Sequence, residues 1–346
     1  MGKNRFDVLL ITHLPNIRYL CGFTGSAAAL AITERSAVLF TDGRYAQQAR
    51  AEVESAKVKI IRKSPLAGVA ELLAGTKSSR RIGIEAAHMT VAERDALRKA
   101  LGRRSKLVAA PGIVEQLRSI KDPEEIGRIR AACHMGAELF NRLLKLIRPG
   151  AFESEIAGEL EFSARKAGAE QMSFPTIIAG GARSALPHGR ASNQPLPARG
   201  FVVCDFGVIL AGYCSDMTRT VHTGAPRAEA RRVYNAVREA QQAAIDAVKP
   251  GVTTGEVDQA ARKLLYNRQL SKFFSHSTGH GVGIEIHEAP RIAAGQKVPL
   301  QAGMVITIEP GVYVPGKWGV RIEDTVMVTE AGCEILTPCP KDLITV

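Results

Sequence analysis

The spacing of apolar and polar positions changes character once along the chain. Up to about residue 111, short apolar runs typical of strands alternate with segments whose apolar residues recur at helical spacing. Thr90 and Glu93 form a capping box at the start of the last of these helices. The alternation predicts a mixed α/β domain. Its expected strands are residues 8–11, 28–33, 37–41, 58–61 and 81–85, and its expected helices are residues 43–54, 65–74 and 90–101.

A second region begins where Asp122 precedes Pro123. Aspartate is a favoured helix cap, proline suits the first helical position, and Glu125 lies three residues after the cap. Apolar residues then recur at helical spacing over residues 126–147, so we expect one long helix that stops before Pro149. The expected domains are residues 1–117 and residues 118–346.

The second region contains an internal repeat. Residues 147–156 resemble residues 248–257, and both copies carry a Pro-Gly pair between two expected helices. The helices after the pairs are expected over residues 155–167 and 256–268, with strands following each. A duplicated unit would arrange its strands around a pseudo-twofold axis. The alternative is a chance match, since Pro-Gly is common after helices.

Bulk composition fits a globular protein, because the 346 residues are 45% hydrophobic and 23% charged. The N-terminal segment lacks the apolar core of a signal peptide, and no run approaches the ~18 apolar residues of a membrane-spanning helix. We therefore expect a cytoplasmic protein with no membrane partner. The six cysteines form no CxxC pair, so we expect reduced, mostly buried thiols.

The formal net charge of +12 raises the question of nucleic-acid binding. The basic residues are scattered in short clusters, however, and aromatic residues make up only 5% of the chain. A solvated basic surface is the preferred interpretation, so no nucleic-acid partner is expected.

Histidines and carboxylates gather toward the end of the chain. Residues 273–323 include three of the eight histidines, interleaved with glycines that let ligands and backbone approach closely. Apolar, strand-like runs also deliver four acidic residues, namely Asp205, Asp216, Glu309 and Glu323. Carboxylates that meet in a protein interior are destabilising or become neutral unless they are compensated. A divalent metal is the natural compensator for such a set.

Three common site motifs are excluded. Residues 287–291 begin like HExxH but end in arginine and contain a proline. Residues 279–284 lack the third glycine of a dinucleotide fingerprint, and residues 311–318 lack the final Ser or Thr of a P-loop. Neither a zincin site nor a nucleotide site is expected.

Five short segments occur in an ordered series. They are Asp-Phe-Gly (205–207), Ser-Asp-Met-Thr-Arg-Thr (215–220), Gly-His-Gly-Val-Gly with the later His-Glu (279–288), Glu-Pro-Gly (309–311) and Val-Arg-Ile-Glu-Asp (320–324). Over about residues 118–346 this series resembles the pita-bread metallopeptidases, which comprise aminopeptidase P, prolidase and methionine aminopeptidase. Residues 16–25 and 41–45 are similar to the amino-terminal domain of Xaa-Pro peptidases and creatinase. The resemblance implies an α/β (α+β) fold in which a creatinase-like mixed α/β domain precedes a pseudo-twofold pita-bread catalytic domain.

The resemblance also implies two divalent metal ions. Asp216 and Glu323 would bridge them, Asp205 would complete one, and His280 with Glu309 would complete the other. Oxygen-rich ligation suits Mn²⁺, Fe²⁺ or Co²⁺ as well as Zn²⁺, and Mn²⁺ is our first candidate. Two such ions can activate a bridging hydroxide as the nucleophile. In the family, the residue at the position of Glu309 passes a proton to the leaving nitrogen.

Four further residues match family positions near the substrate. His188, within Pro-His-Gly at 187–189, and His287 would hydrogen-bond the substrate and the developing oxyanion as catalytic residues. His276 would help shape the pocket for the proline ring. Arg321 is expected in the substrate site, where it would orient Glu323. For the histidines, the alternative is a structural role in a loop or in the core.

The function that the resemblance implies is a metallo-exopeptidase that hydrolyses the Xaa-Pro bond, in dipeptides or at the N-terminus of longer peptides. A homodimer is expected, with the N-terminal domain supporting dimerisation or closing the substrate channel. Creatinase chemistry is disfavoured, because creatinase uses no metal and all five ligand positions are present. Two alternatives stay open. One is an activity like that of methionine aminopeptidase, and the other is a non-catalytic pita-bread binding module.

Overall fold

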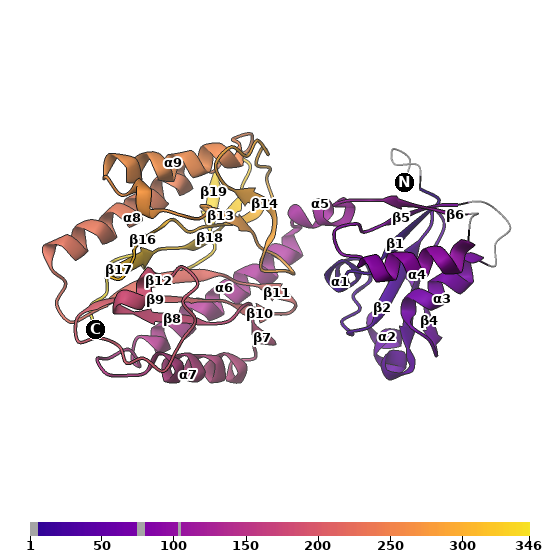
Figure 1. The fold of residues 1–346 in the computed structure, drawn as a ribbon, viewed down its shortest axis with the longest axis horizontal. Helices are drawn as coiled ribbons and strands as arrows, with labels where there is room; N and C mark the ends of the chain where they lie inside the picture. The colour runs from indigo at the N-terminus through magenta and orange to yellow at the C-terminus, as the bar shows by residue number, and fades with distance from the viewer. Residues whose placement is uncertain (1–5, 75–79, 103–104) are drawn as a thin grey trace. The chain divides into compact units, whose positions relative to one another are not determined.

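The computed structural model describes residues 6–74, 80–102 and 105–346. The chain divides into two units, Met1–Arg118 and Ser119–Val346, each with its own sheets and hydrophobic clusters (Figure 1). Within the described ranges, no helix is both long and apolar enough to cross a membrane. All six cysteines are free thiols and five of them are buried, as the absence of paired spacing predicts.

A six-stranded mixed sheet forms the centre of the first unit, in the order β4-β3-β2-β1-β5-β6. The pairs β3–β4, β1–β5 and β5–β6 are parallel, and the others are antiparallel. The strands are β1 (Val8–Ile11), β2 (Ala28–Ile32), β3 (Ala37–Asp42), β4 (Lys57–Ile61), β5 (Arg80–Ile84) and β6 (Ser105–Ala109). The helices are α1 (Leu14–Cys21), α2 (Ala46–Glu52), α3 (Pro65–Ala74), α4 (Val91–Leu101) and α5 (Ile113–Ser119).

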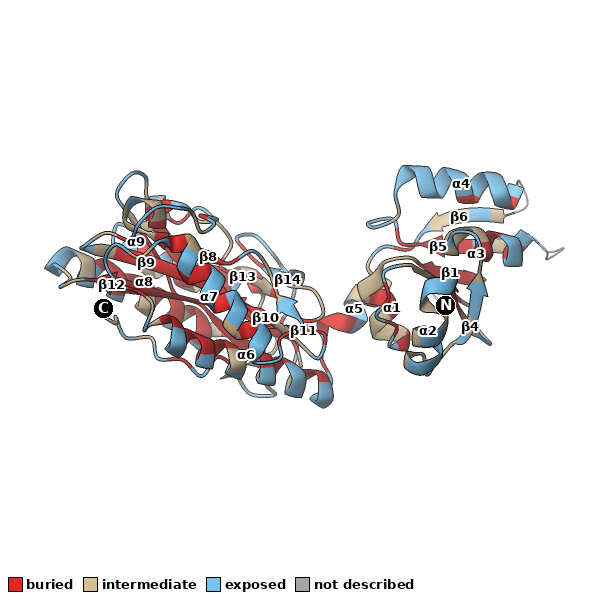
Figure 2. Ribbon diagram, turned by 90° about the horizontal axis from the view of Figure 1, so that it is seen from below, coloured by how far each residue is buried: buried red, intermediate tan, exposed pale blue. Residues whose placement is uncertain are grey.

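Helices cover both faces of this sheet. Val8 and Leu10 of β1 belong to a hydrophobic cluster with residues of α3 and α4, whereas Leu9 and Ile11 belong to one with residues of α1 and α2. Successive side chains of a strand point to opposite faces, so an uninterrupted apolar run such as β1 needs cover on both. The outer face of α4 is exposed to solvent (Figure 2).

The five strands expected in this unit are confirmed to within one residue at each end. The helix expected over residues 43–54 begins instead as a 3-10 turn, Gly43–Tyr45, before α2. Asp42 causes this difference, because its side chain accepts the backbone N–H of Arg44 and tightens the first turn. The apolar spacing predicts neither α1 nor β6, since elements of eight and five residues are too short to show a clear period.

Both expected capping boxes are present. Thr90 Oγ1 accepts the backbone N–H of Glu93 at 3.2 Å, and Asp122 Oδ1 accepts that of Glu125 at 2.9 Å. The long helix α6 (Pro123–Leu143) ends four residues earlier than expected. The Leu143 carbonyl accepts N–H groups from both residue 146 and residue 147, so a tight irregular turn replaces the last helical turn.

The second unit has two similar halves, each with two helices packed on its own strands. In the first half, α6 and α7 (Glu153–Lys166) pack on two three-stranded sheets, β12-β9-β8 and β11-β10-β7. Their strands are β7 (Gln171–Met172), β8 (Ile177–Gly180), β9 (Gly200–Phe206), β10 (Val208–Leu210), β11 (Tyr213–Cys214) and β12 (Met217–Thr223).

In the second half, α8 (Ala228–Ala247) and α9 (Thr254–Asn267) pack on the sheet β14-β13-β15-β18-β19 and on the pair β16-β17. These strands are β13 (Gly279–Gly281), β14 (Glu288–Ile292), β15 (Val305–Ile308), β16 (Gly311–Val314), β17 (Trp318–Arg321), β18 (Asp324–Val328) and β19 (Cys333–Ile335). Figure 2 shows that burial concentrates on the strands between the two helix pairs.

Matched hydrogen bonds make the repeat visible. The N–H of Gly150 donates to the carbonyl of Leu196 at 2.9 Å, and the N–H of Gly251 donates to that of Leu300 at 2.9 Å. The two glycines have φ angles of 81° and 84°, in the left-handed region that favours glycine. The helices α7 and α9 begin just after these turns. The two halves therefore form the same turn at the same point, as the internal repeat predicts.

We expect Gly207→Ala to destabilise the protein by about 3 kcal/mol or more, because a Cβ at this position would lie 1.8 Å from the carbonyl oxygen of Ser215. The matched control is Gly158→Ala in α7, where a Cβ has no neighbour within 4 Å and should stabilise by ~0.5–1 kcal/mol. Urea unfolding of the two purified variants measures both effects. Equal stabilities would show that the close contact at Gly207 is absent.

Candidate metal centre and active site

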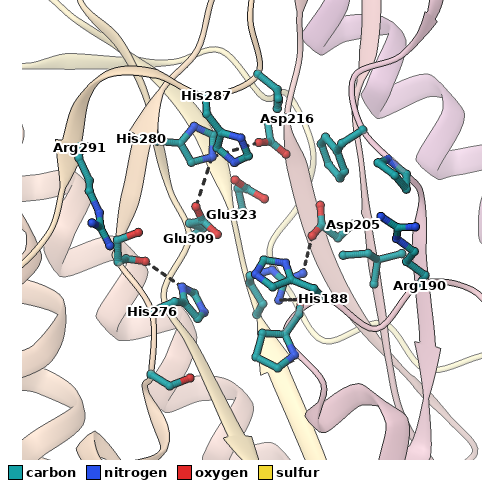
Figure 3. Close-up of a pocket in the computed structure, with 18 of the residues that line it drawn as sticks. His188, Arg190, Asp205, Asp216, His276, His280, His287, Arg291, Glu309 and Glu323 are labelled. Atoms are coloured by element: carbon teal, nitrogen blue, oxygen red, sulfur yellow. Dashed lines mark hydrogen bonds and ion pairs between the residues drawn. The ribbon is translucent and has the colours of Figure 1, made fainter. Parts of the chain in front are cut away.

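The carboxylates expected to bind metal lie where two strand pairs meet, one from each half of the second unit. Asp205 is on β9, and Asp216 directly precedes β12, which pairs with β9. Glu309 directly follows β15, and Glu323 directly precedes β18, which pairs with β15. An antiparallel bridge between Thr218 and Glu323 joins the two pairs. The ends of these strands therefore bring all four carboxylates to one place (Figure 3).

His280 projects from β13 toward the same place. A Cβ on the preceding Gly279 would lie 1.9 Å from the carbonyl oxygen of Thr307, so glycine is what allows β13 to approach β15 closely. The Nε2 atom of His280 lies 3.5 Å from Asp216 Oδ2 and 3.5 Å from Glu309 Oε1. Its Nδ1 lies 3.0 Å from the carbonyl oxygen of the next residue. Since a carbonyl can only accept, Nδ1 carries the proton and Nε2 presents a lone pair to the carboxylates.

The imidazole of His280 is neutral at neutral pH. Burial lowers its pKa to about 4. Its 3.5 Å contacts with Asp216 and Glu309 are therefore not ion pairs. A neutral imidazole whose second nitrogen donates to a backbone carbonyl is the form in which histidine ligates metals.

Burial and mutual repulsion raise the pKa values of the carboxylates. The pKa values of Asp216 and Glu323 lie well above their usual range, first because both groups are buried and then because other carboxylates lie nearby. Burial raises the pKa of Glu309 to about 7. Within the described residues, the buried atoms Asp205 Oδ1 and Glu323 Oε1 have no hydrogen-bond partner. These two oxygen atoms are therefore open to a cation.

The donor atoms fit a divalent cation. Asp216, His280 and Glu323 each offer one ligand atom, and these atoms lie within 4.8 Å of one another. Carboxylate oxygens and an imidazole nitrogen are ligands that Mn²⁺, Fe²⁺, Co²⁺ and Zn²⁺ accept. A cation placed among them would satisfy the unpaired oxygens and offset the repulsion that raises the pKa values.

Arg321 is buried beside these carboxylates. The guanidinium of Arg321 pairs with Asp205 and donates to Thr218 Oγ1 at 3.1 Å and to the hydroxyl of Tyr313 at 2.6 Å. The sequence-based expectation that Arg321 orients Glu323 needs correction. Its side chain reaches across to β9, and Glu323 instead accepts a hydrogen bond from Thr218 Oγ1 at 2.7 Å. Arg321 thus contacts Asp205 directly and Glu323 only through the hydroxyl of Thr218.

The site opens into a cavity of about 730 Å³. Every residue singled out from the sequence lines it, namely His188, Asp205, Asp216, His276, His280, His287, Glu309, Arg321 and Glu323. The ring centroids of His287 and His280 are 4.3 Å apart. Burial lowers the pKa of His287, and the nearby His188 acts in the same direction. The structure therefore brings the nine residues to one cavity, with neutral His287 beside the carboxylates.

His276 belongs to a hydrogen-bonded wall of the cavity. Its Nδ1 lies 2.8 Å from the carbonyl of Ser277, and its Nε2 lies 2.9 Å from the hydroxyl of Tyr313. Because Nδ1 donates to a carbonyl, Nε2 must accept, so the tyrosine hydroxyl donates its proton to Nε2 of His276. The same hydroxyl accepts a hydrogen bond from Arg321. Burial lowers the pKa of His276 to about 4 and raises that of Tyr313 to about 12. Both side chains are neutral at neutral pH.

Sequence reasoning missed four residues of the site: Thr218, Tyr313, Arg190 and Arg291. Thr218 lies within the segment at residues 215–220, but a threonine on a strand is common and does not by itself indicate a functional role. Tyr313 has the pattern of any core aromatic residue. Arg190 directly follows the Pro-His-Gly segment, and Arg291 lies three residues after the His-Glu pair. This proximity to candidate histidines is the only signal that could distinguish them from the other lysines and arginines, which number 46 in total.

Comparison with known proteins agrees with this geometry. The profile of metallopeptidase family M24 matches residues 127–330, and that of the creatinase/prolidase N-terminal domain matches residues 1–120. The chain belongs to metallopeptidase family M24. Membership of a metallopeptidase family implies divalent metal ions, in agreement with the donor set described above. The expected fold, a creatinase-like domain followed by a pita-bread domain, is confirmed.

Relatives of this M24 protein align over almost the whole chain. The structure of an Xaa-Pro dipeptidase from Bacillus anthracis is 38% identical, with a TM-score of 0.95 over 100% of this chain and 96% of that one. An Xaa-Pro dipeptidase from Pyrococcus horikoshii is 36% identical over 99% of this chain and 96% of its own length. The structure of an X-Pro aminopeptidase from Thermotoga maritima is also 36% identical, with a TM-score of 0.92 over 99% of this chain and 98% of that one.

In the metal-free protein, we expect Glu309→Gln to be more stable than the wild type at pH 8.5 and nearly equal to it in stability at pH 4. The pKa of Glu309 is raised to about 7 in the folded state, so the folded state holds this proton more tightly than the unfolded state does. The free energy of unfolding contributed by this group is lost as pH rises from about 4.5 to about 7. The neutral amide avoids this loss, which is on the order of 3 kcal/mol. Urea unfolding at the two pH values measures the difference.

The control for the change in net charge is Glu159→Gln, at an exposed position of α7. This variant should differ from the wild type by a similar small amount at both pH values. A metal-free Glu309→Gln protein that is less stable than the wild type at pH 8.5 would contradict the electrostatic account of the site.

Proposed function

We propose that this protein is a dinuclear metal-dependent peptidase that hydrolyses the Xaa-Pro bond, with Xaa-Pro dipeptides as its substrate class. One observation supports the proposal above all. Four carboxylates, three buried and one half-buried, share a cavity with the neutral imidazole of His280 and the buried guanidinium of Arg321. The dipeptidases from Bacillus anthracis and Pyrococcus horikoshii, similar over nearly their full lengths, support the substrate class.

The residues that would hold the metal ions are Asp205, Asp216, His280, Glu309 and Glu323. Asp216 and Glu323 would serve both ions, as the family resemblance implies, and burial together with neighbouring carboxylates raises the pKa of each. The unpaired oxygens of Asp205 and Glu323 support the same assignment. Mn²⁺ is the first candidate, and Co²⁺, Fe²⁺ and Zn²⁺ suit the same donors.

Bound divalent ions supply a water nucleophile of lowered pKa and polarise the scissile carbonyl. The chain's own groups then handle the protons. Glu309 lines the cavity beside His280 and is the carboxylate that would carry a proton in this proposal. It delivers that proton to the leaving nitrogen. His188 and His287 line the cavity without belonging to the proposed ligand set, and they donate hydrogen bonds to the oxyanion.

A bond to proline is a tertiary amide with no N–H, so its recognition depends on shape more than on hydrogen bonding. The wall at His276 suits this task, since its ring is neutral and its Nε2 already bonds the hydroxyl of Tyr313, which is buried and does not line the cavity. Arg321 holds the wall in place through the Tyr313 hydroxyl. The proline ring of the substrate contacts this wall in the proposal.

The homodimer, the cytoplasmic location and the role of the N-terminal domain stay predictions. Light scattering on the purified chain measures its mass in solution and tests the first of them directly.

The substrate class is tested by hydrolysis of Ala-Pro, Ala-Pro-Ala and Met-Ala-Ala after reconstitution with Mn²⁺, Co²⁺ or Zn²⁺. We expect the metal-loaded protein to cleave Ala-Pro fastest, Ala-Pro-Ala more slowly and Met-Ala-Ala not measurably. Faster cleavage of Ala-Pro-Ala would make the protein an aminopeptidase, as in the relative from Thermotoga maritima. Cleavage of Met-Ala-Ala alone would contradict the proposal.

Three histidine variants separate chemistry from metal binding. His188→Ala and His287→Ala should keep the metal content of the wild type while kcat/KM falls by ~10²–10³, because each removes a donor to charge that develops in the transition state. His280→Ala should lose metal together with activity, since its Nε2 faces the carboxylates. Metal analysis and kinetics on the same preparations decide the matter. Loss of metal in His287→Ala, or full metal content in His280→Ala, would reverse the assignments.

A further inference from the structure

The guanidinium of Arg190 lines the catalytic cavity. Within the described residues its side chain makes no hydrogen bond and no ion pair, although its backbone carbonyl accepts from Arg183 at 2.6 Å. Arg321 is paired with Asp205. Arg291, on the opposite side of the cavity, resembles Arg190 in having no side-chain partner among the described residues. The side chain of Arg190 is exposed at the cavity and keeps its hydrogen-bond donors available for a ligand.

The loop that carries Arg190 is held on both sides by one buried carboxylate. Glu153, at the start of α7, is 1% exposed and accepts hydrogen bonds from Gly180 N at 2.8 Å, Arg183 Nε at 2.9 Å and Ser192 Oγ at 2.6 Å. The same Arg183 donates to the carbonyl of Arg190. The backbone at Arg190 is therefore fixed relative to β8, so the guanidinium is confined to a limited region of the cavity.

Arg190 lies on a definite side of the metal centre. Figure 3 shows it beyond Asp205, whereas Arg291 and His276 lie on the opposite side, near Glu309. In the sheet, Ile177 of β8 pairs with Asp205 of β9, so this side of the cavity also has an apolar surface. Phe174 and Pro175, which directly precede β8, line the same cavity.

The direction of the substrate follows from the proposed function, on which this inference rests. If Glu309 protonates the leaving nitrogen, the proline lies on the Glu309 side, next to His276. The residue before the proline then extends toward Asp205 and Arg190. We propose that Arg190 selects substrates whose Xaa residue carries a carboxylate, with Glu-Pro as the preferred dipeptide.

The chemistry of this side of the cavity fits a glutamate side chain. Its methylene groups would contact the apolar surface of Phe174, Pro175 and Ile177, and its carboxylate would reach the guanidinium, which binds carboxylates in a bidentate manner. Little opposes an anion once divalent ions offset the four ligand carboxylates. The remaining acidic residue of the lining, Glu288, is ion-paired with Lys121 at 3.1 Å.

The test compares Glu-Pro with Gln-Pro, a neutral substrate of almost the same shape, on the metal-loaded full-length protein. For the wild type we expect kcat/KM to be about 3- to 10-fold higher for Glu-Pro, the range for a charge-assisted contact that is partly open to solvent. In Arg190→Met the ratio should fall to about 1, and in Arg190→Lys it should recover in part. In Arg190→Glu, Lys-Pro should become the better substrate. High salt should reduce the wild-type ratio.

Arg148→Met is the matched control, because Arg148 is exposed, lies outside the cavity lining and carries the same charge. It should keep the wild-type ratio. An equal ratio in the wild type and Arg190→Met would overturn the assignment. Loss of turnover on every Xaa-Pro dipeptide would instead contradict the proposed function. Calorimetric affinities for Glu-Pro and Gln-Pro would still decide the role of Arg190 in that case, with equal affinities counting against it.

Discussion

Repulsion among the carboxylates that meet between the two halves of the second unit is the constraint on which this site depends. Asp205, Asp216 and Glu323 are buried, and Glu309 is half-buried beside them. Buried negative charges are destabilising unless protons or cations compensate them, and the raised pKa values of Asp216, Glu309 and Glu323 show the strain in the metal-free state. Divalent ions remove this strain. Folding, metal binding and chemistry are therefore coupled at one place.

The backbone of both halves places these groups. Asp205 and Asp216 lie at the ends of one antiparallel pair, and Glu309 and Glu323 lie at the ends of the corresponding pair. Glycines at which a Cβ would overlap a backbone carbonyl oxygen, such as Gly207 and Gly279, allow neighbouring backbone segments to approach closely near these groups. Rigid strands fix the ligand atoms better than loops can. The substrate-facing groups His188 and Arg190 lie instead on a loop, which the buried Glu153 holds in place.

Much of the fold and of the candidate site could be predicted from the sequence, for identifiable reasons. The strands of the first unit have uninterrupted apolar runs, and the caps at Thr90 and Asp122 have specific chemistry, so both kinds of element were predictable. The carboxylates were detectable because each ends an apolar run. The pairing of Arg321 with Asp205 could not be predicted. An arginine side chain can reach across to another strand, here β9, and the spacing of residues along the chain does not show which residue it will contact. Tyr313 and Arg190 needed the structure for the same reason.

A metal titration of the full-length, metal-free protein tests the central claim most directly. Calorimetry with Mn²⁺, together with metal analysis after gel filtration, counts the ions bound by the wild type and by Asp216→Ala. The account predicts two ions for each wild-type chain and at most a trace for Asp216→Ala, while an exposed variant such as Glu159→Gln keeps both. A wild type that binds no ion, or an Asp216→Ala protein that still binds two, would contradict it.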